Sequence, residues 1–264
     1  STMRGGGVRA VVTCAAVVGA AALRTEPVDL VCRRPNCDVS GVTSPQGPLS
    51  AARLGPRAFV APPLGEVSPQ GWLLNQLVLQ ANGLAGYMPI STFPGAITVN
   101  QSMWVGGTYK TGTDQWLPYW TNGAVPMVEL IRAAGAAGKL DPAADVAGTA
   151  DRYVEYILKH TNRSNGWIGP FLNEPGDNNG HGLWDPLNVL RTLLNYAQAH
   201  PGVEREVAAA CVAHMTKEAE LLKTDPVYKW AQTRWPTYVE IALYIVDEFV
   251  PKYGGDMTVM PAGA

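Results

Sequence analysis

The sequence predicts an all-α fold in which six amphipathic helices pair into about three helical hairpins. Three observations support this prediction. Apolar residues recur at helical spacing from residue 61 onward. No segment shows the alternating pattern and turn residues of a β-hairpin. Short and long links alternate between the predicted helices, an arrangement typical of helices that pack as antiparallel neighbours.

The first 60 residues are expected to lie outside the helical domain. Residues 1–23 combine basic residues with an apolar run rich in Ala, Val and Gly, the pattern of a secretory signal peptide. The run is too short to span a bilayer; a buried N-terminal helix is the alternative. Residues 24–60 are rich in Pro, Gly and Ser and are predicted to form an extended lead-in.

Export determines how the N-terminal cysteines are interpreted. In an oxidising compartment, Cys32 and Cys37 are close enough in sequence to form a small disulfide loop. We therefore expect a secreted, extracellular protein that has no membrane association once the signal peptide is removed.

The helical domain is predicted over residues 61–253, and a tail follows over residues 254–264. Two helices carry a start signal in which a capping residue precedes a proline, namely Ser68-Pro69 and Asp185-Pro186. The six predicted helices span residues 68–84, 120–134, 142–160, 185–196, 203–222 and 235–249.

Long connections distinguish one end of this array. Segments 85–117 and 161–183 follow the first and third helices, and segment 223–230 follows the fifth. If neighbouring helices are antiparallel, all three segments emerge at the same end. Compact domains rarely keep connections of this length unless they have a function. The candidate site is therefore predicted at this end.

The composition favours a neutral, hydroxylated ligand. All eight tryptophans except Trp72 lie in or beside the long connections, and their rings suit a site that is partly apolar and partly wet. The charge is nearly balanced, with 20 basic against 22 acidic residues, which argues against a nucleic-acid partner. The alternative is that the aromatic rings attach the loops to the helix ends. The predicted carbohydrate-binding residues are Gln101, Trp104, Trp120, Trp167, Glu174, Asp177, His181 and Trp184.

Residue chemistry alone assigns no catalytic group. Glycoside hydrolysis requires two carboxylates across a sugar-sized gap. Glu174 and Asp177 lie in a turn, and Asp185 is best explained as a helix cap. His181 could orient a hydroxyl or donate a proton. Cys211 lies in an apolar helical run and is predicted to be a small buried residue.

Five segments follow one another in a characteristic order along roughly residues 60–250. They are PLGEVSPQGWL (63–73), QLVLQANGL (76–84), PYWTNGAVP (118–126), NGWIGP (165–170) and LWDP (183–186). In this order they resemble glycoside hydrolase family 127, the β-L-arabinofuranosidase-like group. The resemblance implies an (α/α)6 toroid, in which six helical hairpins surround a carbohydrate site at one end. It also implies that His181, beside Trp184, matches a histidine of the family that touches the sugar.

The chain also departs from the family. The family's glutamate acid/base, its nucleophilic cysteine and a zinc held by cysteines and a glutamate belong to the second half of the toroid. The sequence has about three hairpins and no Glu-x-Cys motif. The resemblance therefore predicts an incomplete toroid, corresponding to the N-terminal half of the catalytic domain. We assign no nucleophile, metal ligand or cofactor to it, and zinc is implied only for a longer relative.

Two functions from different classes follow. The first is a secreted glycoside hydrolase-like protein that acts on or binds an arabinofuranoside-type or related plant or algal cell-wall carbohydrate. The alternative is a non-catalytic carbohydrate-binding or interaction protein derived from the same fold. An incomplete toroid would also expose apolar faces of its first and last helices. Trp72, Leu77, Val239 and Leu243 are then expected to promote self-association.

Overall fold

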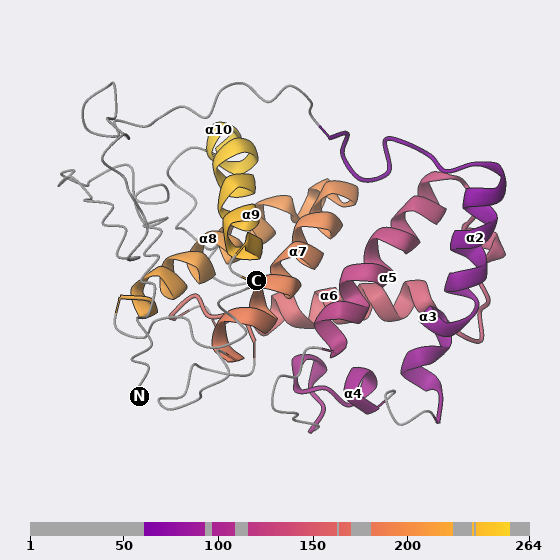
Figure 1. The fold of residues 1–264 in the computed structure, drawn as a ribbon, viewed down its shortest axis with the longest axis horizontal. Coiled ribbons are helices and arrows are strands. Elements are labelled where there is room, and N and C mark those ends of the chain that lie inside the picture. Colours follow the sequence, from indigo (N-terminus) through magenta and orange to yellow (C-terminus); the bar gives the residue numbers. More distant parts are fainter. Residues whose placement is uncertain are drawn as a thin grey trace, which may run out of the picture.

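The computed structural model describes residues 61–92, 97–108, 116–162, 164–169, 181–223, 234 and 236–253. This part is helical and contains no strand (Figure 1), which confirms the all-α prediction. The predicted signal peptide, the lead-in, the tail and the Cys32–Cys37 disulfide lie outside the described residues.

The helices follow the predicted order. The longer ones are α2 (Gly71–Ala81), α5 (Trp116–Ala133), α6 (Val146–Lys159), α7 (His181–Ala199), α8 (Glu204–Leu221) and α9 (Pro236–Tyr244). A π-helical stretch, Ile245–Phe249, continues α9 into α10 (Val250–Tyr253). Short elements occupy the first long connection: α3 (Leu84–Tyr87), η1 (Met88–Ile90), α4 (Ile97–Asn100) and η2 (Met103–Val105). Two more, η3 (Ala137–Lys139) and η4 (Pro201–Val203), lie in the short links.

Helices α5 and α7 are parallel and form the centre of the fold (Figure 1). The hydroxyls of Thr121 and Thr192 are 3.2 Å apart, and His200 Nε2 lies 3.1 Å from Glu129 Oε1. Both pairs are separated by the same 71 residues. A constant offset along two helices requires that they run in the same direction. Helix α6 therefore returns the chain from the end of α5 to the start of α7.

Helix α9 continues this parallel series on the other side of α7. Arg191 Nε lies 3.3 Å from Glu240, and Gln198 Nε2 donates to the Tyr244 hydroxyl at 3.1 Å, so the contacts advance in the same direction along both helices. Helix α8 runs the opposite way. The Tyr238 hydroxyl donates to the carbonyl of Met215, and that of Tyr253 to Glu204.

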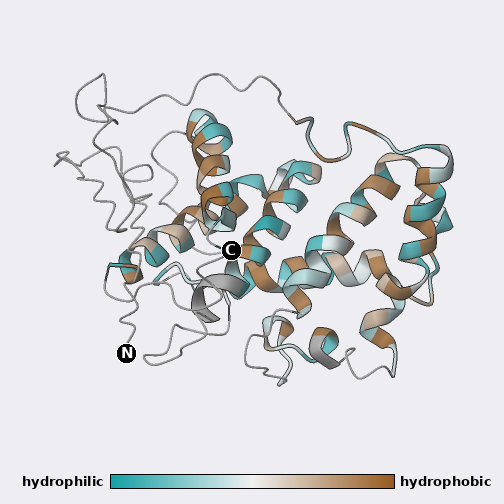
Figure 2. Ribbon diagram, viewed as in Figure 1, coloured by the Kyte–Doolittle hydropathy of each residue, from teal (hydrophilic) through white to brown (hydrophobic). Residues whose placement is uncertain are grey.

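The main hydrophobic core lies between α5, α6, α7, α8 and α9, and a smaller core lies between α2 and α5. Helix α7 is buried on nearly all sides from residue 185 to residue 197, as expected for a helix with neighbours all around it. Hydrophobic residues recur along α5 and α7 (Figure 2), and most of them are buried in these cores.

Both starts predicted from a capping residue and a proline are wrong, and two further starts differ by four residues, since α5 begins at Trp116 rather than 120 and α6 at Val146 rather than 142. Helix α7 begins at His181, four residues before Asp185, so Asp185 is a buried residue of the second turn rather than a cap. Helix α2 begins at Gly71, with Gln70 as an N-cap without a side-chain bond. Gly71 has a left-handed φ of 56°. A right-handed helix that began at Pro69 could therefore not continue through this residue.

The edges of the fold keep some apolar residues exposed. Trp72 and Leu243 are exposed, as predicted, whereas Leu77 and Val239 are partly covered by neighbouring residues. None of the described helices combines the length and the apolar character needed to cross a bilayer.

Candidate functional site

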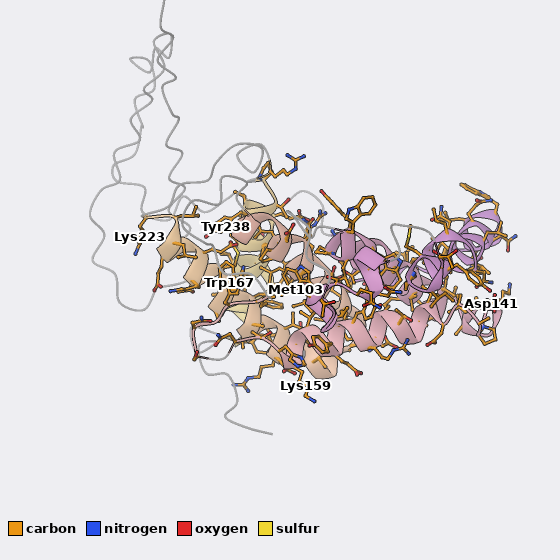
Figure 3. All side chains as sticks on the ribbon, turned by 90° about the horizontal axis from the view of Figure 1, so that it is seen from below. Met103, Asp141, Lys159, Trp167, Lys223 and Tyr238 are labelled. Carbon is orange, nitrogen blue, oxygen red and sulfur yellow. The ribbon has the colours of Figure 1, made fainter. Side chains whose placement is uncertain are left out.

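The two long connections meet at one end of the helical array. Trp104 of the first connection packs against Gly169 of the second so closely that a Cβ at Gly169 would lie 2.4 Å from the indole ring. Met103 and Trp167, from the two connections, lie near each other and far from Asp141, which lies in the short link after α5 (Figure 3). The prediction that segments 85–117 and 161–183 share one end is therefore confirmed only for the described parts around Trp104 and Gly169. The first connection starts elsewhere, because the hydroxyl of Tyr87 donates to Asp141 at 2.7 Å in the link after α5.

The second connection is fixed in place by contacts with α8. The backbone N–H of Ile168 donates to Nδ1 of His214 at 3.0 Å, and the ring of Trp167 tilts against the same imidazole at 4.6 Å. Gly166 adopts a φ of 76° against Ala213, and a Cβ at Gly166 would lie 2.8 Å from the Cβ and 2.9 Å from the carbonyl of Ala213. Only glycine allows this close approach.

The hydrogen bond from Ile168 determines the tautomer of His214. Because Nδ1 accepts, the proton of the neutral imidazole is on Nε2, which donates to Glu218 Oε1 at 3.2 Å. Both side chains are completely buried, and the other carboxyl oxygen, Oε2, meets no partner among the described residues. Burial raises the pKa of Glu218 above its usual value, although the adjacent imidazole opposes the shift.

A cavity of about 180 Å³ opens where the connections meet the end of α6. Its walls come from η2, the last turn of α6 and the second connection, and its lining residues are Met103, Trp104, Tyr156, Ile157, His160 and Gly169. His160 is exposed, whereas Trp104 is only 3% exposed. The cavity therefore opens to solvent on the α6 side and is closed by the indole on the other.

The predicted tryptophans are mainly packing residues in this structure. Trp104 and Trp167 are 3% and 2% exposed, and Trp120 is partly buried, with Nε1 donating to the carbonyl of Ala85 at 2.8 Å. This is the arrangement expected if aromatic rings attach the loops to the helix ends. Of the three, only Trp104 lines the cavity.

The remaining predicted residues are distributed differently. Gln101 is exposed in the turn after α4. The backbone of His181 and Trp184 lies in the first turn of α7, at the same end as the cavity, but their side chains lie outside what the structure describes. Glu174 and Asp177 also lie outside the described residues.

Other aromatic rings at this end do face solvent. Trp116 and Tyr119 lie in the first turn of α5 and are 51% and 46% exposed. The sequence places both in or beside the first connection, but its spacing does not show which rings are covered. Exposed rings are the ones available to a ligand.

Sequence reasoning missed Tyr156 and His160. The apolar stripe of α6 directs attention to its buried side, and these two residues lie outside that stripe. A usable signal was their spacing, because residues i and i+4 are neighbours on a helix, and this pair occupies the last turn before the second connection. Cys211 is fully buried as predicted, and burial raises the pKa of its thiol. Its thiolate is therefore unavailable as a nucleophile.

A second group of titratable residues lies at the opposite end, where α5 ends. Glu129, Asp151 and His200 have their ligand atoms within 4.8 Å of one another, a set that could hold a metal ion. Arg132 already joins the two carboxylates, with Nη1 at 2.5 Å from Glu129 and Nη2 at 2.6 Å from Asp151. The guanidinium supplies the positive charge that a metal would bring. This group therefore ties helices together and does not point to a cofactor.

Comparison with protein-family models, with curated proteins and with solved structures finds no match for this chain.

Proposed function

We propose that the end bearing the long connections binds neutral carbohydrate, and that the helices form part of an α/α toroid. The observation that carries this proposal is the parallel series α5, α7 and α9, joined by the returning helices α6 and α8. In such an array every second helix belongs to one wall and begins at the same end. The two described connections meet at that end.

The chemistry of this end supports a neutral ligand. Trp116 and Tyr119 offer exposed ring faces at the start of α5, and helix starts present free backbone N–H groups that favour hydroxyl oxygens. We infer an arabinofuranoside-type or related cell-wall sugar from the resemblance to glycoside hydrolase family 127. The same resemblance supports export, together with the apolar N-terminal run.

Two activities are compatible with this site: hydrolysis, and binding without turnover. Binding without turnover is favoured by one observation on the described residues. Cys211, the cysteine among the described residues, is fully buried with a raised thiol pKa, so these residues offer no accessible thiolate. Released sugar, measured after incubation of the purified chain with an arabinofuranoside, would establish hydrolysis.

Binding is tested with an arabinofuranose oligosaccharide and Trp116→Ala. We expect isothermal titration calorimetry to detect binding, and the variant to weaken it about tenfold, or about 1.4 kcal/mol, because a stacking face is lost. Trp72→Ala is the matched control, since Trp72 is also exposed (77%) and also lies in a first helical turn. Absence of binding by the wild-type chain, or equal losses in both variants, would contradict the proposal.

A further inference from the structure

We propose that the cavity between η2, the last turn of α6 and Gly169 is a subsite for one uncharged, hydroxylated ring, with Tyr156 and His160 as its polar contacts. This inference rests on the proposed carbohydrate function. It goes beyond that function by naming the residues of one subsite and the size and charge of the group it accepts.

The Tyr156–His160 pair forms a preorganised wall. The two rings are stacked with centroids 3.8 Å apart and an interplanar angle of 17°. His160 Nδ1 lies 2.7 Å from the carbonyl oxygen of Tyr156. A carbonyl can only accept, so Nδ1 carries the proton of the neutral imidazole. Nε2 of His160 is then a hydrogen-bond acceptor for a ligand hydroxyl.

The hydroxyl of Tyr156 is accommodated by a glycine. Gly106 has a φ of 83°, and a Cβ there would lie 2.7 Å from the Tyr156 hydroxyl oxygen. Any other residue at position 106 would press on this hydroxyl. The cavity wall therefore offers one acceptor and one hydroxyl that can both donate and accept, which suits adjacent hydroxyls of a sugar ring.

A second tyrosine–histidine pair shows how the free ring nitrogen of the histidine is used when the protein itself supplies its hydrogen-bond partner. Tyr196 and His200 occupy the end of α7 with the same spacing, their rings stacked at 4.0 Å and 19°. There, Nε2 of the histidine meets Glu129 Oε1 at 3.1 Å. In the pair on α6, the described residues provide no such partner, and the histidine lines the cavity instead.

The opposite wall is formed by the indole ring of Trp104. This side chain is nearly completely buried, and its Nε1 atom is itself covered, so the ring closes the cavity as an apolar surface. Because Gly169 has no side chain, the indole can approach the backbone of the second connection directly.

Size and charge define the ligand class. The cavity of about 180 Å³ is large enough to hold several water molecules, and we assign it one sugar ring, with any further ring lying beyond its open side. None of the described lining residues is permanently charged, so this lining offers no fixed positive charge to a carboxylate or phosphate. Met103 and Ile157 complete the lining with apolar contacts for the C–H groups of a ring.

The test uses methyl α-L-arabinofuranoside and an arabinofuranose oligosaccharide with the full chain, and calorimetry as the readout. His160→Phe keeps the stacked ring and removes the acceptor, and Tyr156→Phe removes only the hydroxyl. We expect each to weaken binding of both probes at least fivefold. Tyr196→Phe, in the matched pair on α7, is the control and should leave affinity unchanged. A charged probe, methyl glucuronide, should bind at least tenfold more weakly than the neutral glycoside.

The outcomes separate this inference from the proposed function. If the wild-type chain binds the oligosaccharide and Trp116→Ala weakens it, but neither Tyr156→Phe nor His160→Phe has an effect, the subsite is overturned and the carbohydrate function stands. Losses in Tyr196→Phe equal to those in Tyr156→Phe, or equal binding of the glucuronide, also overturn the subsite. Absence of binding by the wild-type chain overturns both.

Discussion

At the scale of single residues, the contact between His214 and Glu218 is the most unusual feature of the described part. A carboxyl group is completely buried, and its hydrogen-bond partner among the described residues is the N–H of a neutral imidazole. Burying a charged carboxylate costs more than burying its protonated form. The pair nevertheless fixes the second connection to α8, because the His214 imidazole also accepts a hydrogen bond from the backbone N–H of Ile168.

The raised pKa of Glu218 predicts how stability depends on pH. Between its ordinary value of 4.5 and its raised folded value, the native state binds the proton more tightly than the unfolded state. The free energy of unfolding therefore falls as pH rises through this window. Glu218→Gln keeps the shape without the charge, so urea unfolding should show the variant gaining stability relative to wild type as pH increases from 4 to 7.

The control for this prediction is Glu220→Gln. Glu220 is exposed on the same helix, and surface substitutions of this kind change stability by about 0.5 kcal/mol or less. A stability difference between Glu218→Gln and wild type that does not change with pH would show that burial of the charge is not the cause.

At the scale of helices, the contribution of an ion pair to stability depends on how far the pair is buried from solvent. Arg132 joins Glu129, which is nearly buried on α5, to Asp151 on α6 through two parallel bonds at 3.1 and 2.6 Å. The Asp151 bond raises the pKa of the Arg132 guanidinium further above its usual range. The next residue on α6, Arg152, pairs with Asp145 at 2.8 Å, but both side chains are exposed.

We therefore expect Arg132→Gln to destabilise the chain by about 2–4 kcal/mol, because it leaves a buried carboxylate without its positive partner. Arg152→Gln should cost less than about 1 kcal/mol, since exposed pairs are screened by solvent. Chemical denaturation of the two variants measures the difference. Equal losses would mean that the network around Arg132 is no more important than a surface pair.

The helices themselves were largely predictable from the sequence, whereas their ends and the loops were not. Periodic apolar residues identify a helix because they must share one buried face. Asp185-Pro186 matched a start signal, yet α7 begins at His181, because a capping residue followed by proline also fits inside a buried helix. A loop tryptophan is buried or exposed according to which distant segment packs over it. The local sequence around the tryptophan does not show this.

At the scale of the whole molecule, the parallel order of α5 and α7 decides where the connections lie. The hydroxyl–hydroxyl contact of 3.2 Å between Thr121 and Thr192 sets their register. An antiparallel arrangement would move the start of α7 to the other end and separate the two described connections. The candidate site exists only because the helices have this orientation.

A disulfide tests this orientation. In Thr121→Cys/Thr192→Cys, we expect the two side chains to cross-link under oxidising conditions and to stabilise the chain by about 2–4 kcal/mol. Intact-mass analysis and the unfolding midpoint measure the two effects. Thr121→Cys/Tyr196→Cys, displaced by about one helical turn, is the control and should not cross-link. Cross-linking only in the displaced pair would contradict the parallel register.

The sequence by itself determined the all-helical class, the order of the six helices and the position of the two long connections, because these follow from local periodicity and from spacing along the chain. Only the tertiary structure decided that Trp104 and Trp167 are covered, that Trp116 and Tyr119 are exposed, and that Tyr156 and His160 line a cavity. Exposure is settled by contacts between segments far apart in sequence, since a side chain is buried only when another segment excludes water from it.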